Sequence, residues 1–313
     1  DDVPDTAGQQ PVSTYAAPAA AEGSPGSIVA LGDDPSVRSI QFQTEVFDIV
    51  FDADHASISE MKLRKHVDDG VPVDMIFTDS SEQSAFKTYF GYDTDSRTDY
   101  GYHVTRPDEY TVRFSRDFGI IGDDGQLRPG TFTLTKTFVF MPEDYLFELY
   151  IELRNNINEV VPLNYGGYSY PLEFGPQIGP EFYEAPDGRY EYRRFYTLSE
   201  GKKSEAKLRN NEFELDSLFS WAALTGKYFT VIGIPDATNY TLRLRQGETE
   251  TIPLTSYMMF SRPAIRSSVN TDVYRFYMGP QQKQELVLYN SSDDNGFGLK
   301  DLQLEKAMDA STW

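Results

Sequence analysis

Hydrophobic and polar residues alternate in short runs along much of the chain, which is the pattern of half-buried β-strands. The first clear run spans residues 47–51, where Phe, Ile and Phe are separated by Asp and Val. A second run follows at residues 58–63, and the residues between them, Asp52–His55, have turn chemistry. These two runs predict a β-hairpin near the start of the folded region.

A second hairpin is predicted from Thr131–Phe140 and Leu146–Arg154, joined by a turn at Met141–Asp144. In its first strand, Lys136 falls on the same face as Phe132, opposite a row of threonines. Many short strands at roughly even spacing are typical of a β-sandwich or barrel. The chain is therefore expected to be mainly β. Further strands are predicted at Tyr110–Arg116, Leu163–Pro171, Tyr192–Leu198, Tyr228–Ile234, Tyr240–Arg245, Glu250–Phe260 and Tyr274–Met278.

The two ends of the chain depart from this alternation. Residues 1–35 are rich in Ala, Pro, Gly, Ser and Asp, a composition typical of a flexible linker. At the other end, Pro280–Asn290 and Leu299–Ala310 have apolar residues near helical spacing, which predicts two short α-helices. The expected organisation is a linker at 1–35, a β-domain at 36–280 and a helical segment at 281–313.

Composition narrows the function classes. The 313 residues include 28 basic and 49 acidic side chains, giving a net charge of -21. A surface this acidic repels nucleic-acid phosphates and anionic lipid, so nucleic-acid binding is not expected. The chain has no Cys, which excludes disulfides and Cys-ligated zinc. No apolar run approaches the ~18 residues of a membrane span, and the start at Asp1 without a signal sequence indicates an excised fragment.

Candidate catalytic residues are scarce. The three histidines, His55, His66 and His103, fall in or beside predicted turns, and no Ser, Asp or Glu motif frames them. Exposed loop positions are therefore favoured over a role as general base. The acidic run Asp93–Asp99 lacks the Gly and Glu of a calcium-binding EF-hand loop. We predict no catalytic, cofactor-binding or metal-binding residue, and no cofactor.

Two aromatic segments rich in Gly and Pro leave a choice open. Tyr165–Pro171 and Glu173–Pro180 could line a groove for a sugar or peptide. The alternative, which we favour, is a core-facing strand followed by a rigid loop.

Several segments in order resemble the large periplasmic domain of the YidC family of membrane protein insertases. The resemblance spans about residues 45–313, and four blocks in sequence make it fairly specific. The segments that carry it are Ala53–Lys65, Lys136–Phe140 with Tyr145–Leu149, Trp221–Thr230 with Ile232–Pro235, and Arg275–Pro280.

This resemblance implies a fold and a membrane context. The fold would be a β-supersandwich of antiparallel sheets, similar to galactose mutarotases, with short C-terminal α-helices. The linker at 1–35 would follow one transmembrane helix, and the segment at 281–313 would lead into another, both outside this chain. The domain would lie on the periplasmic side of a Gram-negative inner membrane, as part of a multi-pass protein.

The resemblance also implies a non-enzymatic role, as a scaffold or protein contact in the insertion and folding of inner-membrane proteins. Expected partners are the Sec translocon with its accessory subunits and nascent membrane proteins. Four residues are candidates for coupling the sandwich to a membrane core: Leu299, Leu302, Met308 and Trp313. The alternatives are that these residues only pack on the sandwich, or that the chain is a carbohydrate-binding or mutarotase-like protein.

Overall fold

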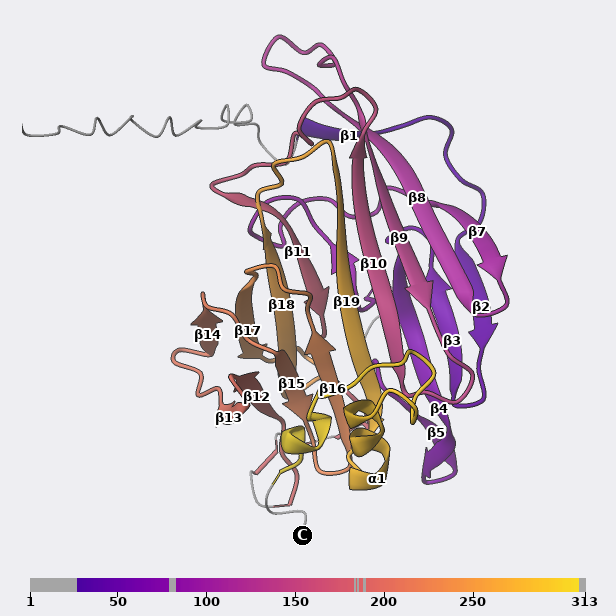
Figure 1. Ribbon diagram of the computed structural model, residues 1–313, viewed down its shortest axis with the longest axis vertical. Coiled ribbons are helices and arrows are strands. Elements are labelled where there is room, and N and C mark those ends of the chain that lie inside the picture. The colour runs from indigo at the N-terminus through magenta and orange to yellow at the C-terminus, as the bar shows by residue number, and fades with distance from the viewer. Residues whose placement is uncertain (1–26, 79–82, 183, 185, 188–189, 310–313) are drawn as a thin grey trace, which may run out of the picture.

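The computed structural model describes residues 27–309 except 79–82, 183, 185 and 188–189. Within these residues the chain is built almost entirely from antiparallel strands arranged in two layers (Figure 1). One layer is a single large sheet, and two smaller sheets pack against one face of it. The alternation of apolar and polar residues that predicts strands thus does determine the fold class.

The large sheet has ten described strands in the order β1-β8-β9-β10-β19-β16-β15-β12-β13, with β7 added beside β8. Its centre is the predicted hairpin, in which Leu149 pairs with Phe138, so that prediction is confirmed. The bounds are β1 (Ile28–Leu31), β7 (His103–Asp108), β8 (Thr111–Ile120), β9 (Phe132–Val139), β10 (Leu146–Asn155), β12 (Arg194–Ser199), β13 (Lys202–Glu205), β15 (Trp221–Thr225), β16 (Phe229–Ile234) and β19 (Val269–Pro280).

The second layer consists of a four-stranded and a five-stranded sheet, joined by isolated bridges between Ile58 and Ala85 and between Phe77 and Gln177. The four-stranded sheet contains the first predicted hairpin, now β3 and β4. Its strands are β2 (Ser39–Gln43), β3 (Phe47–Asp52), β4 (Ser57–Asp68) and β5 (Val71–Asp74). The other sheet runs in the order β14 (Glu212–Leu215), β17 (Thr241–Gly247), β18 (Thr255–Pro263), β11 (Tyr168–Phe174) and β6 (Lys87–Thr88).

Aromatic side chains fill the space between the layers. Phe51 of β3 lies 5.1 Å, centroid to centroid, from Phe138 of β9. Phe86 similarly contacts Phe147 and Phe276 of the large sheet. Edge-to-face pairs of this kind add to the hydrophobic stabilisation of the core, so the high aromatic content found in the sequence is used between the layers.

Two sequence predictions need correction. Strand β1 lies inside the predicted linker, because Ile28–Leu31 pairs with the edge of β8; residues 1–26 lie outside the described residues. The predicted C-terminal helices are much shorter than expected. One α-helical turn, α1 (Lys283–Leu286), continues into the 3₁₀ turn η2 (Val287–Asn290), and the second helix is reduced to the 3₁₀ turn η3 (Leu304–Ala307). The apolar spacing there reflects contacts with the sandwich rather than a regular helix.

Candidate functional site

The C-terminal segment, residues 281–309, packs across one end of the sandwich and is the region that sequence analysis marked for coupling. Leu299, Leu302 and Met308 are half-buried against the hydrophobic core. Trp313 lies outside the described residues. The structure therefore accounts for three of these residues by packing, and their role in coupling stays a prediction.

Polar contacts hold the end of this segment to the large sheet. Asp309 is 3% exposed. Its carboxylate accepts hydrogen bonds from Arg194 Nη1 at 2.7 Å and from the Tyr196 hydroxyl at 2.6 Å. One residue earlier, the Met308 carbonyl accepts from Lys203 Nζ at 2.6 Å. Hydrogen bonds to charged groups are the stronger ones, so the chain is held in place up to its last described residue.

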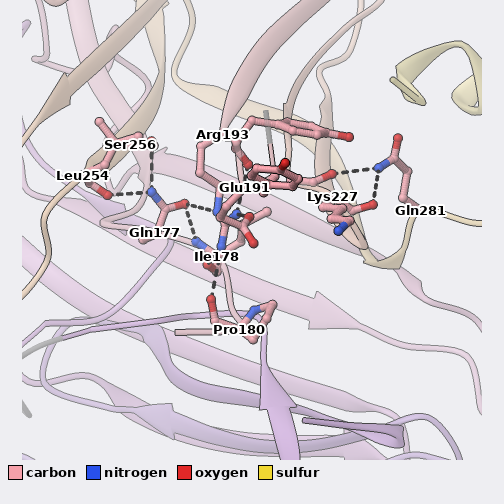
Figure 2. Close-up of polar contacts among 12 residues, drawn as sticks. Gln177, Ile178, Pro180, Glu191, Arg193, Lys227, Leu254, Ser256 and Gln281 are labelled. Atoms are coloured by element: carbon pink, nitrogen blue, oxygen red, sulfur yellow. Dashed lines mark hydrogen bonds and ion pairs between the residues drawn. The ribbon is translucent and has the colours of Figure 1, made fainter. Parts of the chain in front are cut away.

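The start of the segment is held by a buried amide, shown in Figure 2. Gln281 Nε2 donates to the carbonyls of Gly226 and Lys227, at 2.7 and 3.1 Å, in the turn between β15 and β16. Its Oε1 accepts from the backbone N–H of Asp309 at 2.6 Å. One glutamine side chain thus links both ends of the C-terminal segment to the large sheet.

Beside Gln281, a buried guanidinium organises the loop after β11 (Figure 2). Arg193 is 6% exposed and pairs with Glu191. It donates to Gln177 Oε1 at 3.2 Å and to the Pro180 carbonyl at 3.1 Å. These bonds fix the Gly- and Pro-rich loop that follows β11, as the favoured interpretation expected.

The strand before that loop also faces the core. The Tyr170 ring is buried, and its hydroxyl donates to Asp272 Oδ2 at 2.6 Å. Leu172 and Phe174 are buried as well. Tyr168, at the start of the strand, is half-buried and packs against Tyr92. The strand from Tyr170 to Phe174 is buried in the core, which supports the core-facing interpretation for these residues.

A cavity of about 1090 Å³ lies between β1, the β3–β4 turn and β8. It is lined by His55, which sequence analysis assigned to an exposed loop. That assignment is wrong: the His55 side chain is 16% exposed, and its Nδ1 lies 2.5 Å from Asp52 Oδ2. Burial is the largest single influence on Asp52 and opposes its ionisation. The hydrogen bond and charge of His55, with the backbone N–H of Asp54 and the charge of Lys87, together outweigh burial and hold the pKa of Asp52 below its usual value.

The other histidines are separate from this cavity. His66 Nε2 lies 3.2 Å from the Tyr145 hydroxyl, and burial lowers the pKa of His66. His66 lines a groove of about 640 Å³ near Gln281. His103 begins the edge strand β7 and is exposed, as predicted. The three histidines therefore do not converge on one site.

The acidic loop at Asp93–Asp99 behaves as an ordinary charged surface. Asp99 accepts a hydrogen bond from Arg97 Nε at 2.8 Å, and Asp93 lies 3.5 Å from Arg243 Nη1. Within the described residues, no group of three or more His, Asp or Glu side chains is placed to hold a metal ion. Nor does any helix in residues 27–309 have the length and apolarity needed to cross a membrane.

Comparison with known proteins identifies the family. A family model described as the YidC periplasmic domain matches residues 39–309. The membrane protein insertase YidC of Treponema denticola is 29% identical over 287 residues, covering 88% of this chain and 49% of the relative. YidC of Treponema pallidum is 31% identical over 224 residues, covering 61% of this chain and 35% of the relative. The chain thus spans about half of one relative and about a third of the other.

Solved structures confirm the fold. A galactose mutarotase-like protein from Lactobacillus casei has a TM-score of 0.52, with 10% identity over 77% of this chain and 99% of the other. At this identity the likeness concerns the fold alone. The fold is mainly antiparallel β and galactose mutarotase-like, as the sequence resemblance implied. With a family match over most of its length, the chain belongs to the YidC periplasmic domain family of membrane protein insertases.

Proposed function

We propose that this chain is the non-catalytic periplasmic domain of a membrane protein insertase and acts as a scaffold that positions protein contacts during insertion. It would lie on the periplasmic side of a Gram-negative inner membrane, within a multi-pass protein. Its partners would be the Sec translocon with its accessory subunits and nascent membrane proteins. Family membership supports the insertase context. The scaffold role, the membrane location and the partners are part of the proposal.

The observation that carries the scaffold role is the fixed C-terminal segment. Asp309, Gln281 and Met308 all bond to the large sheet or to each other through polar contacts of 2.6–3.1 Å. The point at which the chain leaves the sandwich, at Asp309, is therefore fixed. Rigid elements with satisfied hydrogen bonds transmit orientation better than loose linkers.

A flexible insert tests this idea without disturbing the sandwich. In the full-length protein, a Gly/Ser linker placed directly after Asp309 leaves every contact above in place but decouples the domain from the membrane part of the protein. We expect insertion of a substrate membrane protein to fall several-fold. The matched control places the same linker in the exposed loop at Asp123–Gly125, between β8 and β9. Unimpaired insertion with the linker after Asp309 would contradict rigid coupling.

The contribution of the Asp309 contacts to stability can be tested in the isolated chain. Asp309→Ala removes the acceptor for Arg194 and Tyr196, and we expect it to lower the free energy of unfolding by about 1–2 kcal/mol. The control is Asp293→Ala, since Asp293 is exposed, and its effect should stay within about 0.5 kcal/mol. Urea titration followed by tryptophan fluorescence measures both, because Trp221 Nε1 donates to the Leu302 carbonyl of the same segment.

A further inference from the structure

The C-terminal segment contains the only Asn-Gly pair of the 313-residue sequence, Asn295–Gly296. Asparagine before glycine is the pair most prone to spontaneous deamidation, because glycine has no side chain to hinder the approach of its backbone nitrogen to the carboxamide. The pair lies in the loop between η2 and η3, with Asn295 half-buried and Gly296 exposed. Water can therefore reach the reacting atoms.

The side chain of Asn295 holds this loop together. Its Nδ2 donates to the carbonyls of Leu288, Ser291 and Leu299, at 3.1, 3.0 and 2.8 Å. Its Oδ1 accepts from the backbone N–H of Leu299 at 2.9 Å. The amide has two donor hydrogens for three carbonyls, so one hydrogen is shared. One side chain thus closes the loop from Leu288 to Leu299.

Close packing explains why glycine follows the asparagine. A Cβ atom added at Gly296 would lie 2.9 Å from Met141 Cβ and 3.2 Å from Asp144 Oδ2, in the turn between β9 and β10. The Gly296 N–H donates to the same Asp144 oxygen at 2.9 Å. The structure therefore uses both residues of the labile pair, the asparagine to close the loop and the glycine to let it approach the large sheet.

These contacts oppose deamidation while the chain is folded. In that reaction the Gly296 nitrogen loses its proton and attacks Cγ of Asn295, so the carboxamide must turn away from its hydrogen-bond partners. The partners hold it through contacts of 2.8–3.1 Å, and Asp144 holds the Gly296 N–H. Attack therefore needs local opening of the loop, and its rate follows the population of the open state.

We propose that Asn295 is a deamidation site which the folded C-terminal segment suppresses, and whose modification releases the loop from Leu288 to Leu299. The Gly296 nitrogen forms a bond to Cγ, the bond from Cγ to Nδ2 breaks, and ammonia leaves with the proton of the attacking nitrogen. Water then opens the resulting succinimide ring to give aspartate or isoaspartate.

The product cannot make the bonds of the asparagine. A carboxylate has no donor hydrogen, so the three carbonyls lose their partner and face a negative charge instead. Leu299, which is half-buried against the core, then loses the contacts that hold its backbone in place. Deamidation and release can both be measured in the isolated chain, so their outcome is independent of whether this segment acts in insertion.

Peptide mapping by mass spectrometry measures the modification. The chain is incubated at mildly alkaline pH, folded in buffer or unfolded in guanidinium chloride. We expect Asn295 to deamidate at least about tenfold more slowly in the folded chain. A synthetic peptide of residues 291–299, incubated in both solutions, corrects for the effect of the denaturant. Equal rates in the folded and unfolded chains, or no modification in the unfolded chain, would overturn the proposal.

The variant Asn295→Asp reproduces the aspartate product. Backbone N–H groups of residues 288–302 should exchange with deuterium about tenfold faster than in the parent, whereas β9 and β10 should exchange as slowly as before. Ser292→Asp is the matched control, because Ser292 is exposed in the same loop and gains the same charge. Unchanged exchange in Asn295→Asp contradicts release. Equal acceleration by Ser292→Asp contradicts it too, because the added charge and not the lost bonds would then be the cause.

Discussion

Lys136→Met is expected to raise the free energy of unfolding by roughly 1–4 kcal/mol at about pH 6. Lys136 lies in the centre of β9, fully buried between the layers. Its ammonium donates to the Phe86 carbonyl, and no carboxylate among the described residues bonds to it directly. Methionine has a similar length and places no charge in the core. The variant would retain the packing and lose the cost of burying an ammonium group.

The gain should depend on pH. Burial, opposed in part by Asp52, lowers the pKa of Lys136 to about 7 from its ordinary 10.5. Between these two pH values the unfolded chain binds the proton and the folded chain does not, so the stability of the parent protein rises as pH increases. Below about pH 7 both states are protonated and the full cost of burial applies. The advantage of Lys136→Met is therefore largest at and below neutrality and shrinks toward pH 10.

Urea denaturation of both proteins at about pH 6 and about pH 9 measures this difference, because other titrating groups are common to the two chains. Lys300→Met is the matched control, since Lys300 is exposed and its substitution should change stability little at either pH. A variant less stable than the parent by the same amount at both pH values would show instead that the Lys136 hydrogen bond stabilises the fold.

Lys136 also shows which structural features the sequence pattern can predict and which it cannot. The alternation along Thr131–Phe140 correctly placed this lysine on the face shared with Phe132. Periodicity identifies which face a residue occupies, because side chains in a strand alternate strictly. It gives no information on the partner, here a carbonyl 50 residues earlier in the chain. The central strands were therefore predictable, whereas their polar contacts were not.

Short edge strands were the main omission. The strands β2, β5, β6, β7, β13 and β14 were not predicted, and β1 was taken for linker. Edge strands such as β1, with four residues, have too few positions to show a period, and their pairing depends on a partner strand far away in sequence. The prediction of two helices in the C-terminal segment failed for a different reason. Leu299 and Leu302 pack on the sandwich but lie outside any helical turn. Their spacing matches that of a helix, although contacts with the sandwich are what hold them in place.

The cavity beside His55 could not be predicted as a whole, although one signal for it was present. Asp52 precedes His55 by three residues in a predicted turn, a spacing that lets the two side chains meet. Arg116 joins them from a strand more than 60 residues later, and only the packing of the layers brings it there. A cavity built from separate segments is a property of topology, which short motifs do not encode.

The largest loss of stability is expected from Asp272→Ala. Asp272 is 1% exposed in β19. It accepts hydrogen bonds from Arg262 Nε at 3.1 Å and from the Tyr170 hydroxyl at 2.6 Å. Removing the carboxylate leaves a guanidinium with 12% side-chain exposure without its partner charge. Breaking a buried pair from one side costs about 3–5 kcal/mol, which is a large part of the stability of a typical domain.

Two comparisons distinguish a buried charge from a lost contact. If the cost comes from the unpaired guanidinium of Arg262, adding Arg262→Met to Asp272→Ala should recover part of the loss, so a double-mutant cycle should show strong coupling. The exposed pair Arg97–Asp99, with side chains 67% and 60% exposed, is the control, and Asp99→Ala should cost no more than about 1 kcal/mol. Additive effects of the two substitutions at Asp272 and Arg262 would contradict the unpaired-charge explanation. The cost would then arise from the Tyr170 hydroxyl and the cavity left behind, because Tyr170 also bonds to Tyr274 at 2.9 Å and transmits the change to the core of β19.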